Sequence, residues 1–185
     1  MGGIGGLVVM DEAYQPFAAR DSMALLRRHP HVLVMRTMSK FGLAGVRIGY
    51  LIGRRELVAE IDKLRPPFNV SVLNAEAGLF ALEHADEYAR QAADIRAERE
   101  KVFGWLAATP GVRPFPSQAN MILARVPDAA ALFGGMRQRG VLVKNVSGLH
   151  PLVANCLRIT IGTPDENVRM IEALRASLQA DPTRG

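Results

Sequence analysis

The chain has 185 residues, of which 49% are hydrophobic, and this composition is typical of a folded globular protein and argues against disorder. Its net charge is +5, but the densest basic stretch, residues 90–101, is interleaved with acidic side chains, so no nucleic-acid-binding stripe is indicated. No apolar run reaches the ~20 residues that cross a bilayer, and the single cysteine, Cys156, has no internal disulfide partner. We therefore expect a cytoplasmic protein that uses neither a membrane nor a nucleic acid as partner.

Short apolar runs alternate with helical patterns in the first half of the chain. Residues 7–10, 32–35 and 48–52 predict three buried strands, and residues 22–29 and 56–64 predict helices between and after them. Strands that are apolar throughout are usually covered on both faces. This pattern predicts a piece of a mostly parallel α/β layer.

The second half changes character. Residues 72–107 are dominated by helical patterns with a break near 84–86, and Pro110-Gly111 predicts a turn. Short strands are then expected at 121–124, 142–143 and 157–161, and helices at 132–139 and 165–179. The last helix has a Thr cap, a first-position proline and acidic residues in its first turn. We predict an α/β domain over residues 1–90 and an α+β domain over residues 91–185.

Polar residues that could take part in binding or catalysis follow two of the predicted strands. The first strand ends in Asp11-Glu12-Ala13-Tyr14. The second strand leads to Ser39 and Lys40, and the guanidinium of Arg47 follows seven residues after Lys40. In parallel sheets, ligands bind beyond the carboxyl ends of strands, where Asp11 and Lys40 both fall. A hydroxyl and a planar guanidinium suit a phosphate dianion, and a lysine near other cations can capture a carbonyl group.

Simpler interpretations exist for each residue taken alone. Lys40 could be an exposed lysine on a turn. Asp11-Glu12 could be the polar end of a strand, or an acidic pair that binds the metal ion of a bound nucleotide. No G-x-x-x-x-G-K loop precedes that pair. The four histidines and Cys156 share no metal-ligand spacing, so no metal site is predicted. The five residues together favour a ligand site.

Together, Asp11-Glu12-Ala13-Tyr14, Ser39-Lys40 and Arg47 resemble the signature of fold-type I, class I/II aminotransferases. That resemblance implies pyridoxal 5'-phosphate as cofactor, held by Lys40 as a Schiff base, with Lys40 also the catalytic general base and acid. It implies that Asp11 pairs with the pyridinium nitrogen and that Tyr14 bonds the ring hydroxyl. Ser39 and Arg47 would bind the cofactor phosphate.

Three segments of the second half are similar to the small domain of the histidinol-phosphate branch of this family: residues 116–123, 140–144 and 155–162. Carried over by position, Arg158 would bind the substrate α-carboxylate, and Lys144 would lie near the phosphate of the substrate. Lysine can act there as a point charge but lacks the bidentate geometry of arginine. For Asn120, a turn residue is the preferred interpretation over a substrate contact.

The resemblance covers residues from about 7 to 178 and matches only the C-terminal portion of such enzymes. It implies amino-group transfer between histidinol phosphate and 2-oxoglutarate, in histidine biosynthesis, and a homodimer for the full-length family. We expect this chain to be a fragment that is inactive alone. Two alternatives stay open: a related aminotransferase acting on aromatic amino acids or threonine phosphate, and a non-catalytic remnant that needs a partner half.

Overall fold

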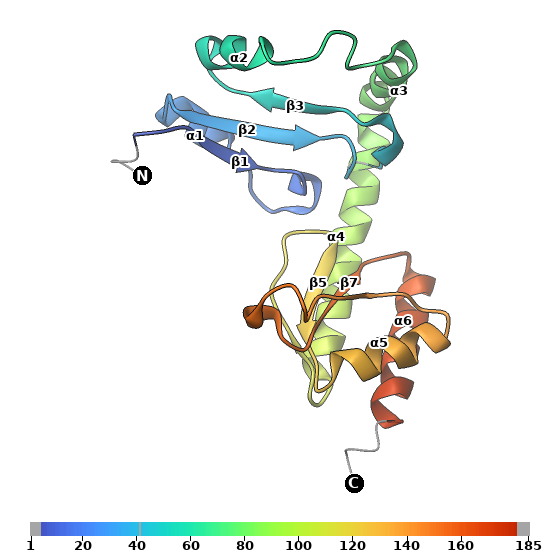
Figure 1. Ribbon diagram of the computed structural model, residues 1–185. Helices are drawn as coiled ribbons and strands as arrows, with labels where there is room; N and C mark the ends of the chain where they lie inside the picture. The colour runs from blue at the N-terminus through green and yellow to red at the C-terminus, as the bar shows by residue number, and fades with distance from the viewer. Residues whose placement is uncertain (1–4, 41, 181–185) are drawn as a thin grey trace. The chain divides into compact units, whose positions relative to one another are not determined.

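The computed structural model describes residues 5–40 and 42–180, and the chain divides into two compact units. Unit 1 comprises Met1–Ala92 and unit 2 comprises Ala93–Gly185, so the boundary falls within the long helix α4 (Ala85–Ala108). Each unit carries its own sheet (Figure 1). The two sets of predicted site residues therefore belong to different units.

The sheet of unit 1 has the order β1-β2-β3, formed by Val8–Asp11, Val32–Thr37 and Gly49–Ile52. β1 and β2 are parallel, with Asp11 opposite Met35, whereas β2 and β3 are antiparallel, with Thr37 opposite Gly49. The connection between β2 and β3 is too short for the crossover that parallel strands need. The first pair is thus of the expected parallel kind, and β3 is an antiparallel addition.

Three α-helices of unit 1 follow the predicted positions: α1 (Met23–Arg28), α2 (Arg55–Asp62) and α3 (Val72–Glu83). Two short 3-10 helices, Gln15–Phe17 and Ala44–Val46, were not predicted, since three residues give no periodic signal. α3 begins where the Ser71 hydroxyl accepts the Asn74 N–H at 3.2 Å. It ends before the expected break, which lies at His84.

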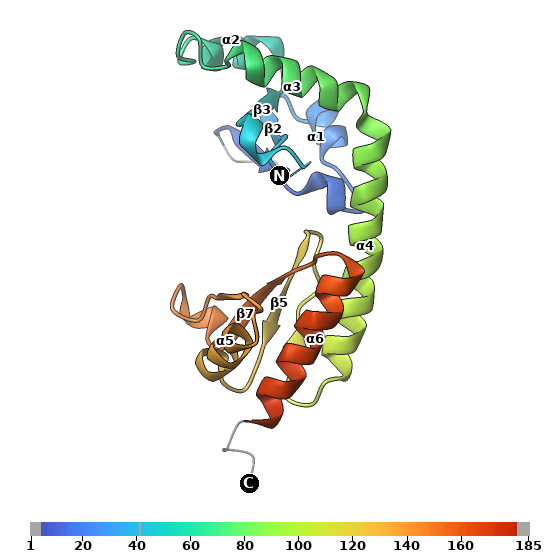
Figure 2. The same ribbon diagram turned by 90° about the vertical axis from the view of Figure 1, so that its right-hand side faces the viewer.

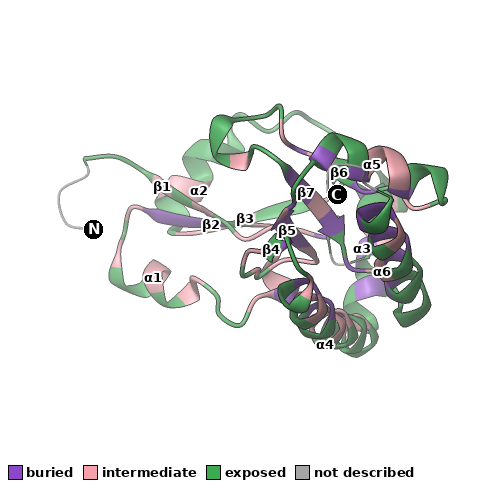
Figure 3. Cartoon of the chain, turned by 90° about the horizontal axis from the view of Figure 1, so that it is seen from below, coloured by how far each residue is buried: buried purple, intermediate pink, exposed green. Residues whose placement is uncertain are grey.

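Burial in unit 1 is uneven, and the expectation that its strands are covered on both faces was correct only for the centre of β2. Val32, Leu33 and Val34 of β2 are buried, as Figure 3 shows by the purple stretch of that strand. Val9 of β1 and Met35 of β2 are, however, 51% and 41% exposed. An apolar run indicates only that both faces of a strand can be buried; whether they are depends on what packs against them.

Unit 2 is an antiparallel sheet covered by helices. Its strands have the order β4-β5-β7-β6. They are β4 (Arg113–Pro114), β5 (Met121–Arg125), β6 (Lys144–Asn145) and β7 (Cys156–Thr160), and the helices after α4 are α5 (Ala129–Gln138), a 3-10 turn (Pro151–Val153) and α6 (Pro164–Gln179). The predicted strand at 142–143 is displaced to 144–145, because a two-residue edge strand is set by its partner.

One apolar cluster forms the core of unit 2. It joins α4, β5, α5, β7 and α6 through buried residues that include Leu106, Ile122, Leu132, Met136, Leu157, Ile159 and Leu174. α6 lies beside α4 (Figure 2), and the Asn167 amide donates to Glu98 of α4 at 2.9 Å. The predicted cap of α6 is confirmed as a reciprocal capping box between Thr163 and Glu166.

Candidate functional site

The Asp11 and Lys40 segments leave the unit 1 sheet at the same edge. β1 and β2 are parallel and in register, and β1 ends at Asp11 while β2 ends at Thr37. Both segments therefore emerge from the carboxyl ends of neighbouring strands, which is the usual ligand-binding edge of a parallel sheet.

A tight turn follows β1. The Asp11 Oδ1 atom accepts the N–H of Ala13 at 2.9 Å, which bends the chain directly after the strand. Tyr14 comes immediately before the 3-10 helix, and Phe17 at the end of that helix is buried and anchors the segment. The Asp11 side chain is left exposed to a ligand.

A second turn follows β2 and brings Ser39, Lys40 and Arg47 into place. The Thr37 hydroxyl donates to the Ile48 carbonyl at 3.2 Å and accepts the Ser39 N–H at 3.1 Å. Arg47 has a left-handed backbone with φ of 54°, and its Nη1 atom donates to Ser39 Oγ at 3.3 Å. The hydroxyl and the guanidinium predicted to bind phosphate are thus in contact, and both can donate to one anion.

Lys40 and Tyr14 also meet, although they come from different strands. The Lys40 Nζ atom lies 5.5 Å from the centroid of the Tyr14 ring, within the range of a cation–π interaction. Lys40 is exposed and has no carboxylate ion-paired to it among the described residues. Its amine is therefore available to a carbonyl compound at this edge.

Lys144 and Arg158 are direct cross-strand partners in unit 2. They pair across β6 and β7, so their side chains stand on the same face of the antiparallel sheet. Within residues 5–40 and 42–180, no carboxylate pairs with either cation, and the buried Nε of Arg158 has no hydrogen-bond partner. Two like charges placed opposite each other destabilise a sheet, and an anionic ligand bound between them would relieve this repulsion.

The structure singles out two charged residues to which the sequence assigned no role of their own, and one amide whose buried surroundings were not predicted. Glu12 and Arg36 form an ion pair in unit 1, with Nη2 and Oε2 2.8 Å apart. Asn120 lies in a bend before β5, as preferred from the sequence, but its buried Oδ1 has no hydrogen-bond partner. The ion pair joins residues 24 positions apart in the chain, so no local pattern signals it.

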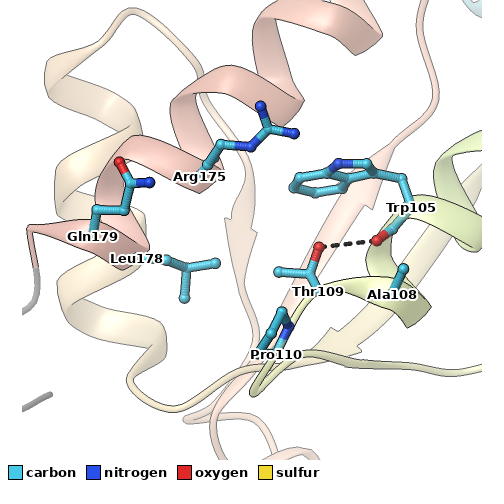
Figure 4. Close-up of a pocket in the computed structure, with 7 residues that line it drawn as sticks. All are labelled: Trp105, Ala108, Thr109, Pro110, Arg175, Leu178 and Gln179. Atoms are coloured by element: carbon cyan, nitrogen blue, oxygen red, sulfur yellow. Dashed lines mark hydrogen bonds between the residues drawn. The ribbon is translucent and has the colours of Figure 1, made fainter.

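Two surface hollows of unit 2 contain none of the predicted residues. One, of about 540 Å³, lies between the last turns of α4 and α6, where the Arg175 guanidinium stands 5.7 Å from the Trp105 ring centroid (Figure 4). The other, of about 360 Å³, lies beside the start of α6 and is lined by Val143 and Thr160 among others. Trp105 also packs against the apolar core of unit 2.

Two further features concern membranes and metals. None of the helices in the described part of the chain combines the length and the apolar composition that a membrane span requires. The same residues contain no group of three or more His, Cys, Asp or Glu side chains placed to hold a metal ion.

Comparison with known proteins identifies the family. The family model "Aminotransferase class I and II" matches residues 4–174. The chain is 68% identical over 174 residues to histidinol-phosphate aminotransferase of Methylibium petroleiphilum, covering 94% of this chain and 47% of that protein. It is 60% identical to the enzyme of the same name from Polaromonas naphthalenivorans, covering 94% and 48%.

Solved structures agree with this assignment. Histidinol-phosphate aminotransferase from Sinorhizobium meliloti in complex with pyridoxal-5'-phosphate superposes with a TM-score of 0.79 at 28% identity, covering 94% of this chain and 49% of that one. The predicted fold-type I class is confirmed. The chain spans about half the length of the curated relatives it matches. The chain belongs to the aminotransferase class I and II family.

Proposed function

We propose that this chain carries the cofactor-anchoring and anion-binding residues of an aminotransferase that exchanges an amino group between histidinol phosphate and 2-oxoglutarate. The observation that carries the proposal is the gathering of Asp11, Tyr14, Ser39, Lys40 and Arg47 at one edge of the unit 1 sheet. The names of the relatives supply the substrate.

The residues at this edge fit pyridoxal 5'-phosphate. Arg47 and Ser39, whose side chains are 3.3 Å apart, would bind its phosphate, and Asp11 would accept from its ring nitrogen. Tyr14 would donate to the ring oxygen, and the Lys40 amine would hold the aldehyde carbon. When bound, the cofactor supplies an electron sink for the bonds at the substrate Cα.

Lys40 would perform the proton transfers of the reaction. Once an amino substrate has taken its place, the free Lys40 amine can remove the proton from the substrate Cα as a general base. The same amine can return the proton as a general acid. The Tyr14 ring, whose centroid lies 5.5 Å from the Lys40 Nζ atom, would help to hold this amine at the site.

Lys144 and Arg158 would bind the anionic group of the substrate. Arg158 offers a planar fork to a carboxylate, and Lys144, opposite it across β6 and β7, adds a point charge near the substrate phosphate. Histidinol phosphate presents a phosphate and 2-oxoglutarate presents carboxylates, and both suit a pair of adjacent cations. The homodimer implied by the family resemblance stays a prediction.

The experiment is to incubate the chain with pyridoxal phosphate, reduce with borohydride and locate the label by mass spectrometry. We expect one label, on Lys40, and none at that position in Lys40→Ala. Asp11→Asn should retain the label but weaken cofactor retention during desalting. Equal labelling of Lys63 and Lys101 would show non-specific amine chemistry and would contradict the proposal.

Substrate choice is tested separately, with the chain that shows Lys40 labelling. Histidinol phosphate should displace the cofactor from Lys40 before reduction, and phenylalanine should do so at least tenfold less effectively, because one lost charged hydrogen bond alone costs about 1.5–3 kcal/mol. Arg158→Lys should weaken the displacement by histidinol phosphate. Equal displacement by both compounds would instead favour a related aminotransferase acting on aromatic amino acids.

A further inference from the structure

The ion pair between Glu12 and Arg36 lies at the carboxyl ends of β1 and β2, next to the residues of the candidate cofactor site. Asp11 and Met35 are opposite each other in the parallel pair of β1 and β2. Glu12 and Arg36 each come one residue later, so they point to the other face of the sheet. The backbone N–H of Glu12 still donates to the Met35 carbonyl at 2.8 Å, which continues the pairing past the end of β1.

Each charge of the pair has further partners. Arg36 Nε donates to Glu12 Oε2 at 2.9 Å, and Arg36 Nη2 lies 2.8 Å from the same oxygen. The other carboxylate oxygen of Glu12 accepts the N–H of Ser22 at the start of α1. Asp21 lies 3.8 Å from Arg36 Nη2, and the Glu12 side chain is only 9% exposed. The network therefore joins β1, β2 and the start of α1.

The protonation of Arg36 is consistent with this network. Burial alone would lower the pKa of Arg36, but the hydrogen bond and the charge of Glu12, together with Tyr50 of β3, raise that pKa above its ordinary value. Arg36 therefore stays charged. Removing one partner would leave the other as an unpaired charge at this partly buried position, which is costly. Substitution of either residue should therefore disrupt the whole interaction.

We propose that Glu12 and Arg36 are positioning residues that hold the Lys40 turn against the Asp11–Tyr14 turn. The inference rests on the proposed cofactor site. Glu12 lies between Asp11 and Tyr14 in the chain, and Arg36 begins the segment that ends in Lys40. The pair thus joins the two turns at their bases, whereas the Lys40–Tyr14 contact is made at their tips, with a 5.5 Å separation.

The effect of breaking the pair should be local. The buried residues of β2 are Val32, Leu33 and Val34, which precede Arg36 and do not take part in the ion pair. A merely structural role would loosen these residues together with the turns. A positioning role loosens the turns and leaves the centre of β2 protected, because the two turns hold no other ion pair between them among the described residues.

Hydrogen exchange of the ligand-free 185-residue chain tests this directly. The variants are Glu12→Gln, which keeps the shape but removes the charge, and Arg36→Lys, which keeps the charge but removes the fork. The matched control is Glu60→Gln, which breaks the exposed pair with Lys63. We expect about tenfold faster exchange in peptides containing Tyr14 and Lys40, which corresponds to losing one charge-assisted contact.

Peptides of residues 32–34 and of unit 2 should exchange as in the unsubstituted chain, and Arg36→Lys should give a smaller change than Glu12→Gln. Uniform acceleration across unit 1 in both variants, or no change in the turns, would overturn the inference. Labelling of Lys40 by pyridoxal phosphate is then measured for the same variants. If the unsubstituted chain fails to label, the proposed function fails, and the exchange result still decides the positioning role.

Where labelling occurs, Glu12→Gln should require roughly tenfold more cofactor for half-labelling, since the amine is no longer held in place. The melting temperature of each variant is recorded alongside. A loss of labelling that follows the melting temperature in all variants, Glu60→Gln included, would count against positioning.

Discussion

The two units of the chain bury their apolar residues to very different extents. Unit 2 closes a single cluster around Leu106, Ile122, Leu157 and Leu174, all of them fully buried. Unit 1 buries the centre of β2 but leaves Val9 and Met35 of its sheet exposed. The difference teaches that an antiparallel sheet with helices on one face can form its own core, whereas a layer sheet needs cover on both faces.

Helix α3 makes the difference plainest. Only Gly78 and Ala81 of this helix are buried, whereas Leu73 is 81% and Phe80 56% exposed. Apolar residues occur all round α3, and such a helix is normally enclosed by protein. Exposed apolar surface of this kind favours association.

The largest expected effect comes from the core of unit 2. Leu174→Ala should lower the free energy of unfolding by about 2–5 kcal/mol, because a cavity would be left in a fully packed site. The measurement is chemical denaturation followed by circular dichroism, which reports on both units, and by fluorescence of Trp105, the single tryptophan, which packs against the unit 2 core. The control Leu73→Ala should change stability by less than about 0.5 kcal/mol. Similar losses in both variants would contradict the contrast between the units.

A glycine pair gives the next largest effect, with opposite signs in the two units. Gly42→Ala should destabilise unit 1 by about 1–2 kcal/mol, because φ is +108° and a Cβ would lie 3.1 Å from the Tyr88 ring. Gly104→Ala, in α4 with open space around it, should stabilise by roughly 0.5–1 kcal/mol. Thermal unfolding followed by circular dichroism measures both variants. A stabilising effect of Gly42→Ala would show that residue 42 does not have this positive φ.

Acid should weaken unit 2 through Glu98. Hydrogen bonds from Lys101 and then Asn167 lower the pKa of Glu98 below its ordinary value of 4.5. The stabilisation is therefore present above that ordinary pKa and is lost as the pH falls through the lower pKa of the folded state. Glu98→Gln should lower the melting temperature at pH 7 and should approach the unsubstituted chain at pH 3. Glu172→Gln, at an exposed position of α6, is the control, and its melting temperature should match that of the unsubstituted chain at pH 7.

The smallest effect on stability belongs to α3. Leu73→Glu should change the free energy of unfolding by less than about 0.5 kcal/mol, since the side chain is exposed, yet it should reduce light scattering at high protein concentration. Leu132→Glu, in the buried core of unit 2, is the opposite case and should unfold that unit. Unchanged scattering in Leu73→Glu would place the associating surface elsewhere.

Much of the site could be predicted because its residues are close in sequence to strand ends. The apolar runs that precede Asp11 and Lys40 predict parallel strands, and the carboxyl ends of such strands share one edge of the sheet. The pairing of Lys144 with Arg158 could not be predicted. The strand was expected two residues earlier, where Leu142 is 77% exposed, and only pairing with β7 selects residues 144–145.

The sequence by itself determined the family and the approximate positions of the helices, and it predicted which residues would carry the chemistry, because capping residues, apolar periodicity and turn signals act over a few neighbouring positions. The tertiary structure decided which strand faces are covered, that β3 is antiparallel, and that Glu12 meets Arg36. These features depend on groups 10 to 24 residues apart, as in the contacts of Glu12 with Ser22 and Arg36. Burial and charge pairing depend on what packs nearby, which local sequence does not specify.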